Sequence, residues 1–173
     1  MTQQFPGSKR AAKFLFTAFL LTAVAAFIWG FFVANKVRAR AKQTDCALRS
    51  IAWACLCYVQ QGDRSWPDSE ASLLGPGASQ DGSWTCESIA VQSEPWPSTR
   101  EAAMAGLAPP ATLTEALKMG GLEFSKNSSD APHVNARGNP SGLDTLITVN
   151  AWLTSYQSMR STPLGDAKIG QPK

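Results

Sequence analysis

The amino-acid sequence predicts an α+β protein, in which a long N-terminal helix precedes a small C-terminal domain of short helices and a small antiparallel sheet. Three observations predict this class. Residues 14–34 form an uncharged apolar run. No Gly or Pro interrupts the chain between Val33 and Gln61, where good helix formers dominate. From Gly62 onward, turn residues alternate with short apolar segments, which is typical of a small mixed domain.

Charges are distributed unevenly along the chain. Sixteen basic and thirteen acidic residues give a formal net charge of +3, but no acidic residue precedes Asp45. Seven basic residues lie in the first 42 positions, which leaves nine against thirteen acidic ones from Gln43 onward. Because no basic face suited to nucleic acid is visible, we expect no nucleic-acid partner. The seven flank the apolar run: Lys9, Arg10 and Lys13 before it, and Lys36, Arg38, Arg40 and Lys42 after it.

The apolar run has the length of a membrane-spanning helix. Its 21 residues, Phe14 to Ala34, extend about 30 Å as a helix, which matches the hydrocarbon core of a bilayer. The hydroxyls of Thr17 and Thr22 can return to the helix backbone, and Trp29 stands near the far end, where amphipathic rings favour the interface. The alternatives are a buried soluble helix and a signal peptide cleaved at Ala23-Val24-Ala25. We predict a single-pass anchor in a lipid bilayer.

We expect the helix to run unbroken from about Lys9 to Gln61. Beyond the apolar run, apolar residues from Leu48 to Val59 recur at three- and four-residue steps. Cys46 and Trp53 lie on a second face, so this half must be covered by its own domain, by neighbouring copies, or by both. The predicted organisation is a basic cytoplasmic tail (1–13), a transmembrane helix (14–34), an amphipathic continuation (35–61), a small α+β domain (62–162) and a disordered tail (163–173).

Capping and turn signals divide the small domain. Ser98-Thr99-Arg100-Glu101 is a capping box that opens a short helix. Thr112 to Glu115 is a second capping box, whose helix stops at Gly120-Gly121. Leu122 to Ser125 suits a strand, with a partner strand beginning at Val134. A last helix face consists of Leu143, Leu146, Val149, Leu153, Tyr156 and Met159.

Two Trp-Pro pairs stand 30 residues apart, at Trp66-Pro67 and Trp96-Pro97. Pro in the first turn of a helix explains each pair locally. Together with Trp53, Trp84 and Trp152, these side chains supply large anchors for a small core. We therefore expect the tryptophans to pack in the core rather than form a binding site.

The predicted helix limits how the four cysteines can pair. Cys55 and Cys57 lie about 200° apart around a helix, while Cys46 and Cys57 are separated by roughly 16 Å, beyond the limit of ~7 Å for a disulfide. An intrachain disulfide must therefore use Cys86, with Cys55 or Cys57 as its partner. The alternative is buried thiols in the core. A zinc site is disfavoured, because a rigid helix cannot aim Cys55 and Cys57 at one ion.

No constellation of catalytic residues is apparent. The single histidine, His133, has a loop-like context near Ser128, Ser129 and Asp130, but a triad is recognised by spatial roles. The Gly-Pro-Gly segment at 75–77 lacks the Lys and Ser/Thr of a phosphate-binding loop. We predict no enzymatic activity, no cofactor and no metal.

A series of motifs within residues 9–74 points to a known family. A basic run precedes a cysteine, and an apolar helix ending in Tyr leads to a Gly turn and an aromatic residue before Pro. The residues that carry these motifs are Arg38, Arg40, Lys42, Cys46, Leu48, Tyr58, Gly62, Trp66 and Pro67. With its basic tail, apolar helix and small C-terminal domain, the chain resembles bacterial type IV pilins and the pseudopilins of type II secretion.

The resemblance implies a structural or assembly protein of the inner membrane, with an exported, periplasmic C-terminal domain and homo-oligomers that form through the transmembrane helix. It does not extend to the processing site: Gly7 precedes Ser8-Lys9-Arg10, and Ala12 stands where the family has a Glu. The local tally of Lys and Arg, three before the span and four after it, slightly favours a cytoplasmic C-terminal domain. A monomeric membrane-anchored binding or accessory module is the alternative function.

Overall fold

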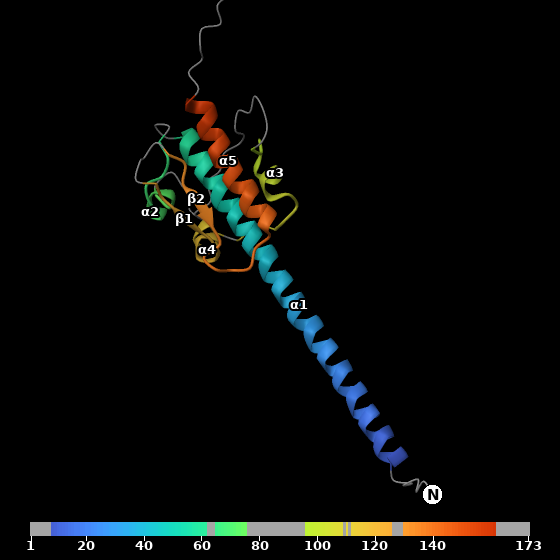
Figure 1. The fold of residues 1–173 in the computed structure, drawn as a ribbon. Helices are drawn as coiled ribbons and strands as arrows, with labels where there is room; N and C mark the ends of the chain where they lie inside the picture. Colours follow the sequence, from blue (N-terminus) through green and yellow to red (C-terminus); the bar gives the residue numbers. More distant parts are fainter. Residues whose placement is uncertain are drawn as a thin grey trace, which may run out of the picture. The chain divides into compact units, whose positions relative to one another are not determined.

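The computed structural model in Figure 1 describes residues 8–61, 65–75, 96–108, 110, 112–125 and 130–161. These residues form five helices and one two-stranded antiparallel sheet, which confirms the α+β class. The chain divides into two compact units, Met1–Ala39 and Arg40–Lys173, and we call the second the C-terminal domain. The elements are α1 (Ser8–Gln61), α2 (Glu70–Leu73), α3 (Arg100–Met104), α4 (Leu113–Met119), β1 (Gly121–Glu123), β2 (His133–Asn135) and α5 (Leu143–Ser161).

Helix α1 runs without interruption, as predicted from the absence of Gly and Pro after Val33. Its part within the C-terminal domain forms the centre of the core, because every residue from Ile51 to Cys57 is buried. Seven consecutive buried residues cover all sides of a helix over about two turns. This half of α1 is expected to be covered by its own domain, by neighbouring copies, or by both. In the structure its own domain covers it.

Arg49 joins α1 to two other helices of the domain. Its Nη1 donates a hydrogen bond to the carbonyl oxygen of Ala103 in α3 (3.0 Å). Its guanidinium carbon lies 5.5 Å from the ring centroid of Trp152 in α5, a distance at which a cation is attracted to the face of an indole. One half-buried side chain thus ties α3 and α5 to the central helix.

Hydroxyl caps begin α3 and α4. Thr112 Oγ1 accepts a hydrogen bond from the Glu115 backbone N–H (3.2 Å), so α4 starts where predicted. For α3 the N-cap is Thr99 rather than Ser98, because Thr99 Oγ1 accepts from the Ala102 N–H (3.2 Å). Ser and Thr both serve as N-caps, and sequence alone does not choose between two adjacent hydroxyls.

The predicted strand pair is confirmed, with Leu122 opposite Val134 in an antiparallel register. A side chain of α5 completes the outer edge of β2: Asn150 Oδ1 accepts from the Val134 N–H (2.8 Å), and its Nδ2 donates to the Val134 carbonyl (2.9 Å). At the other edge, Glu70 accepts from the Leu122 N–H (3.4 Å) and pairs with Arg137. These contacts satisfy backbone groups that two strands alone leave open.

Close packing explains the Gly120-Gly121 pair that ends α4. Gly120 has φ −121°, which any residue can adopt, so its glycine is not needed for a left-handed turn. A Cβ at this position would lie 2.8 Å from Leu48 Cδ2 and 3.0 Å from Ile51 Cδ1. The absence of a side chain therefore lets the end of α4 approach the buried face of α1.

Helix α5 buries only the middle of its predicted apolar face. Val149, Leu153 and Tyr156 are buried, whereas Leu143 is 74% exposed and Met159 is 42% exposed. The predicted helix is confirmed, and its apolar face is covered only in the middle. Three- and four-residue steps identify the apolar side of a helix, but they do not show how far the neighbouring elements extend along it.

The two Trp-Pro pairs meet at one aromatic side chain. Trp66 and Trp96 are buried, and both pack edge-on against Tyr156, with centroid distances of 6.1 and 5.4 Å. Edge-to-face geometry is the preferred arrangement of aromatic rings. The expected core role of Trp53, Trp66, Trp96 and Trp152 is confirmed, while Trp84 and the predicted tail 163–173 lie outside the described residues.

Replacing Gly120 with Ala should destabilise the C-terminal domain. The added methyl group would displace Leu48 and Ile51 from a packed core, which costs about 1–3 kcal/mol. Chemical denaturation followed by tryptophan fluorescence would measure the loss. Gly30→Ala is the matched control, because a Cβ there meets no atom within 4 Å. Equal stability of Gly120→Ala and the parent chain would contradict the packing described here.

Candidate membrane-spanning segment

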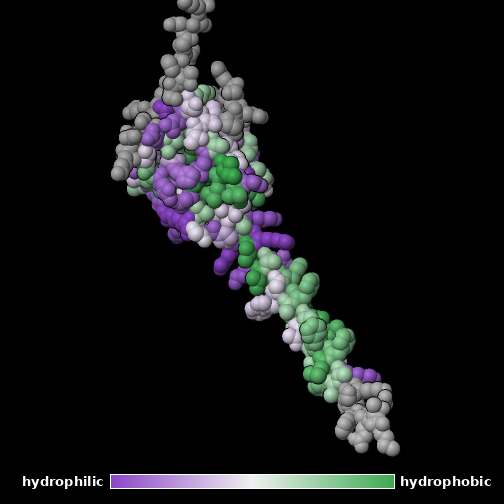
Figure 2. Space-filling model, viewed as in Figure 1, coloured by the Kyte–Doolittle hydropathy of each residue, from purple (hydrophilic) through white to green (hydrophobic). Residues whose placement is uncertain are grey.

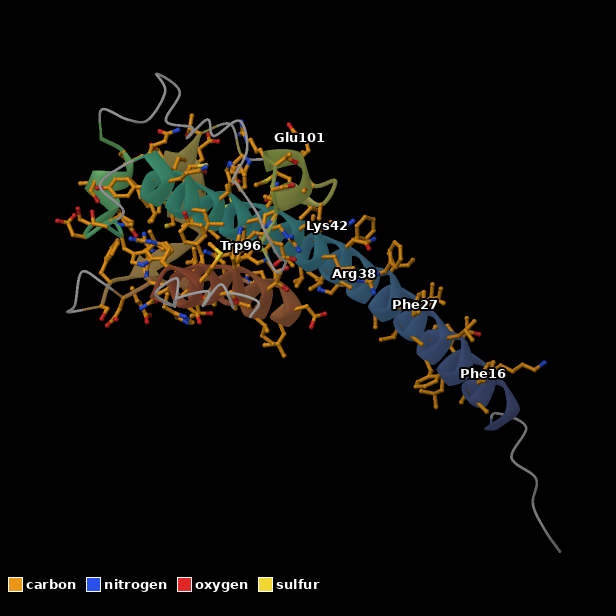
Figure 3. All side chains as sticks on the ribbon, turned by 90° about the horizontal axis from the view of Figure 1, so that it is seen from above. Phe16, Phe27, Arg38, Lys42, Trp96 and Glu101 are labelled. Atoms are coloured by element: carbon orange, nitrogen blue, oxygen red, sulfur yellow. The ribbon has the colours of Figure 1, made fainter. Side chains whose placement is uncertain are left out.

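The apolar part of α1 is exposed to solvent on every side. All residues from 11 to 40 are exposed, and the large apolar side chains among them range from Val33 at 47% to Phe14 at 79%. Phe16 and Phe27 project outward from the helix (Figure 3). Figure 2 shows this stretch as a largely hydrophobic surface.

This exposure distinguishes the segment from the core helix of a soluble domain. Soluble monomers rarely expose large contiguous apolar surfaces, and no described residue covers this one. Among the described residues, α1 is the one helix long and apolar enough to cross a membrane. The same length and composition are found in signal peptides, but here apolar residues continue from Ala26 to Ala34, beyond the candidate cleavage site.

The two threonines of the span satisfy their hydroxyl groups within the helix. Thr17 Oγ1 donates to the Lys13 carbonyl oxygen, and Thr22 Oγ1 donates to that of Ala18, each at 2.9 Å. This confirms the expected return to the backbone. Since an unpaired polar group in hydrocarbon costs several kcal/mol, these bonds make both residues compatible with a lipid environment.

The basic residues that flank the span project into solvent. Lys13, before the apolar run, is exposed, and among the described residues it has no ion-pair partner. Lys9 and Arg10 belong to α1, but their side chains lie outside what the structure describes. After the run the exposed basic residues are Lys36, Arg38, Arg40 and Lys42, and these too form no ion pair with any described residue.

The structure does not test the predicted disulfide, because Cys86 lies outside the described residues. Cys55 and Cys57 are both fully buried. Burial raises the pKa of the Cys55 thiol far above its ordinary value, so this group is protonated at neutral pH and unreactive as a nucleophile. The pairing of Cys86 with Cys55 or Cys57 stays a prediction.

Cys46 has a polar environment that the sequence did not reveal. Its Sγ donates to the Ala108 carbonyl oxygen (2.8 Å) and lies 3.9 Å from Met104 Sδ. Burial raises the pKa of the Cys46 thiol, while the guanidinium groups of Arg49 and Arg100 act in the opposite direction. The three-residue spacing of Cys46 and Arg49 on α1 is a signal for this proximity, but Arg100 comes from a distant segment.

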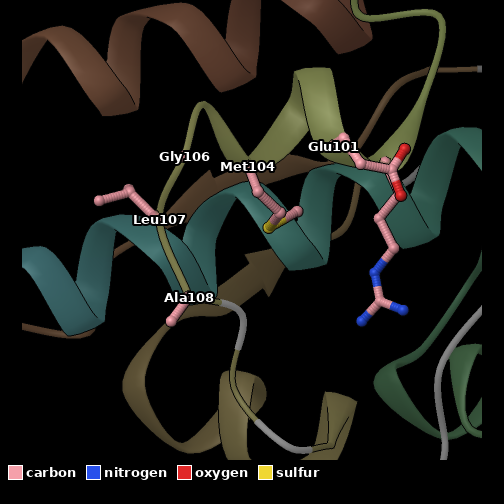
Figure 4. A pocket seen from close by; sticks show the side chains of 6 residues that line it. Glu101, Met104, Gly106, Leu107 and Ala108 are labelled. Atoms are coloured by element: carbon pink, nitrogen blue, oxygen red, sulfur yellow. The ribbon is translucent and has the colours of Figure 1, made fainter.

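Two hollows lie on either side of this cluster. One, of about 450 Å³, is lined by α3 and the segment after it, including Glu101, Met104 and Leu107 (Figure 4). The other, of about 600 Å³, lies between α4 and α1 and includes Glu115 and Lys118. Both are mainly apolar. The second also includes Cys46, whose thiol donates to the Ala108 carbonyl oxygen and not to Glu115 or Lys118.

The remaining candidates for chemistry are dispersed. His133 is exposed on β2. Asp130 accepts hydrogen bonds from Ser125 Oγ (2.9 Å) and Gln157 Nε2 (3.3 Å), which gives it a structural role. Ser128 and Ser129 lie outside the described residues. Within the part of the chain that the structure describes, no group of three or more His, Cys, Asp or Glu residues is placed to hold a metal ion.

The chain matches no protein-family model, no curated protein and no solved structure. One feature of the described residues constrains the environment of the chain. The apolar stretch of α1 from Phe14 to Ala34 is compatible with single-pass anchoring in a lipid bilayer.

Replacing Leu21 with Lys should weaken membrane association. A charge near mid-span costs about 2.5–3.5 kcal/mol on insertion scales. The membrane fraction that resists carbonate extraction should therefore fall sharply. Leu21→Ile is the matched control and should remain fully membrane-bound. Because Leu21 is exposed in the fold, the C-terminal domain of both variants should unfold at the same denaturant concentration as that of the parent chain. Unchanged extraction of Leu21→Lys would show that the span is misassigned.

Proposed function

We propose that this protein is a single-pass membrane-anchored structural or assembly subunit of the pilin-like kind, with an exported C-terminal domain. The observation that carries the proposal is the contrast between the two parts of α1. Residues 11–40 are exposed on all sides, whereas Ile51 to Cys57 are buried by the chain itself. The exposed apolar part therefore requires lipid, neighbouring copies of the helix, or both.

A row of small residues along the span supports contact between copies. Residues at four-residue spacing share one side of a helix, and small residues there allow two helices to approach closely within a bilayer. A Cβ placed on Gly30 would meet no atom within 4 Å, so this position is open to a neighbour. The row consists of Ala18, Thr22, Ala26, Gly30 and Ala34.

The second candidate is a monomeric membrane-anchored binding or accessory module. It is favoured by the complete coverage of α1 within the C-terminal domain, where Leu48, Ile51 and Leu56 are fully buried. A domain that encloses its own central helix needs no neighbouring copy for stability. In this candidate, the exposed part of α1 contacts only lipid.

A cysteine at Ala26 should form cross-linked dimers in native membranes if the subunits assemble. Ala26 lies in the row of small residues, where close approach is expected. Ile28→Cys is the matched control, because position 28 lies about 200° around the helix from position 26. Oxidative cross-linking and non-reducing gels would give the readout, with the parent chain showing the background from native cysteines. Monomer alone in both variants, at native expression, would reject assembly and favour the monomeric module.

The C-terminal domain should lie outside the cytoplasm. A folded protein tag fused after Lys173 should be digested by protease added to spheroplasts, while a tag fused before Met1 should be protected until the membrane is lysed. The pilin-like proposal requires this orientation, although the local Lys and Arg tally slightly favours the opposite one. A protected C-terminal tag would contradict the exported domain and would also remove the oxidising environment that the Cys86 disulfide needs.

A further inference from the structure

Four basic residues follow the apolar run of α1 within two turns of the same helix. We call Lys36, Arg38, Arg40 and Lys42 the basic collar. All four are exposed, and none forms an ion pair with any residue that the structure describes. Hydrophilic side chains project from α1 directly after its hydrophobic stretch in Figure 2, and Arg38 and Lys42 are labelled in Figure 3. Within the described part of the chain, the collar is therefore a concentrated positive charge without an ion-pair partner.

The collar surrounds the helix instead of lying along one side. At about 100° per residue, Lys36 and Arg40 project from one side of α1, and Arg38 and Lys42 project from the opposite side. A helix that lies flat on a membrane carries its basic residues on one polar face. Cations on opposite sides suit a helix that crosses the headgroup layer, where each side meets lipid.

The collar begins within the headgroup layer. The rise from Lys36 to Lys42 is about 9 Å, and Lys36 stands two residues, or about 3 Å, beyond the last apolar residue, Ala34. The polar layer on each side of the hydrocarbon core is roughly 5–8 Å thick. With Ala34 at the edge of the hydrocarbon, Lys36 and Arg38 lie about 3 and 6 Å beyond it, within this layer, and Arg40 and Lys42, at about 9 and 12 Å, reach back to it with their long side chains.

The acidic residue nearest to the collar along the chain has a partner elsewhere in the fold. The nearest acidic residue along the chain is Asp45, and its Oδ1 accepts a hydrogen bond from the Gly142 backbone N–H (2.8 Å). Gly142 immediately precedes α5, whose N-terminus favours a negative charge. Asp45 is thus engaged within the C-terminal domain, and among the described residues no carboxylate pairs with the collar.

We propose that the basic collar binds the phosphate groups of anionic phospholipids and enriches these lipids around α1. Guanidinium groups form paired hydrogen bonds with phosphate, and the two lysines add point charges. Juxtamembrane basic residues are attracted to the negative surface potential of anionic lipids. The inference rests on the proposed membrane anchoring and adds to it the chemical class of the lipid partner.

The test uses the full-length protein in vesicles of phosphatidylglycerol and phosphatidylcholine. Energy transfer from the tryptophans is not specific to the collar, so a fluorophore attached at Ala34→Cys serves as donor to trace amounts of labelled lipid. A variant with Ala34→Cys alone should favour labelled phosphatidylglycerol over phosphatidylcholine by roughly three- to tenfold. The preference should weaken as salt rises, because exposed charges are screened.

Adding K36Q, R38Q, R40Q and K42Q to that variant should bring the preference to about one. R38K with R40K keeps the charge and should retain the preference, and K118Q removes an exposed cation from the C-terminal domain without effect. A preference that survives the fourfold change would overturn the proposal. Displacement of the labelled lipid by inorganic phosphate at constant ionic strength would also overturn it, in favour of a soluble anion.

Flotation with vesicles separates this inference from the anchoring on which it rests. Both the parent and the fourfold variant should float with vesicles of phosphatidylcholine alone, because the apolar run is unchanged. Failure of the parent chain to float would reject membrane anchoring, and with it the collar's lipid contact. Normal flotation without any lipid preference would reject the collar proposal alone.

Discussion

Burial of the second half of α1 is the constraint on which the C-terminal domain depends. From Ile51 to Cys57 the helix is enclosed on every side, so its neighbours must surround it and cannot merely cover one face. Helices α2, α3 and α4 have four, five and seven residues, which is too short for stability in isolation. They form within the domain, where α3 accepts a hydrogen bond from Arg49 of α1 and α4 ends against the same helix. The glycine at position 120 is one consequence, since α4 must end in contact with Leu48 and Ile51.

Polar side chains then complete a sheet that is too small to satisfy its own edges. The Asn150 amide exchanges two hydrogen bonds with Val134, and the Glu70 carboxylate accepts from the Leu122 N–H. Gln157 Oε1 accepts from the Ala131 N–H (2.7 Å), so α5 holds the segment that leads into β2 at a second point. Asn150 and Gln157 are seven residues apart, which places them on one side of α5. The sheet is thus attached to α5 by side-chain amides rather than by apolar packing alone.

Much of this architecture could be predicted from local signals. The extent of α1, the Thr112 cap and the pairing of β1 with β2 follow from composition and from short motifs. Other features depend on contacts between segments far apart in the chain. The exposure of Leu143, the approach of Arg100 to Cys46 and the bonds of Asn150 to Val134 are set by tertiary neighbours. The candidate span follows from sequence alone, because its length and hydropathy do not depend on contacts with other segments.

The exposed part of α1 contains apolar and basic residues. Their contributions to the free energy of membrane binding respond to different conditions. Each Leu, Ile, Phe or Val near the middle of a span favours insertion by about 0.3–0.6 kcal/mol, and this term does not depend on the headgroup or on salt. Each basic residue near an anionic surface adds about 1 kcal/mol, and this term falls with distance and ionic strength. In the function proposed above, the apolar run accounts for entry of the helix into a bilayer, and the collar accounts for the choice of lipids around it. Because Ile51 to Cys57 are enclosed by their own chain, we expect substitutions in the apolar run or in the collar to leave the folding of the C-terminal domain unchanged.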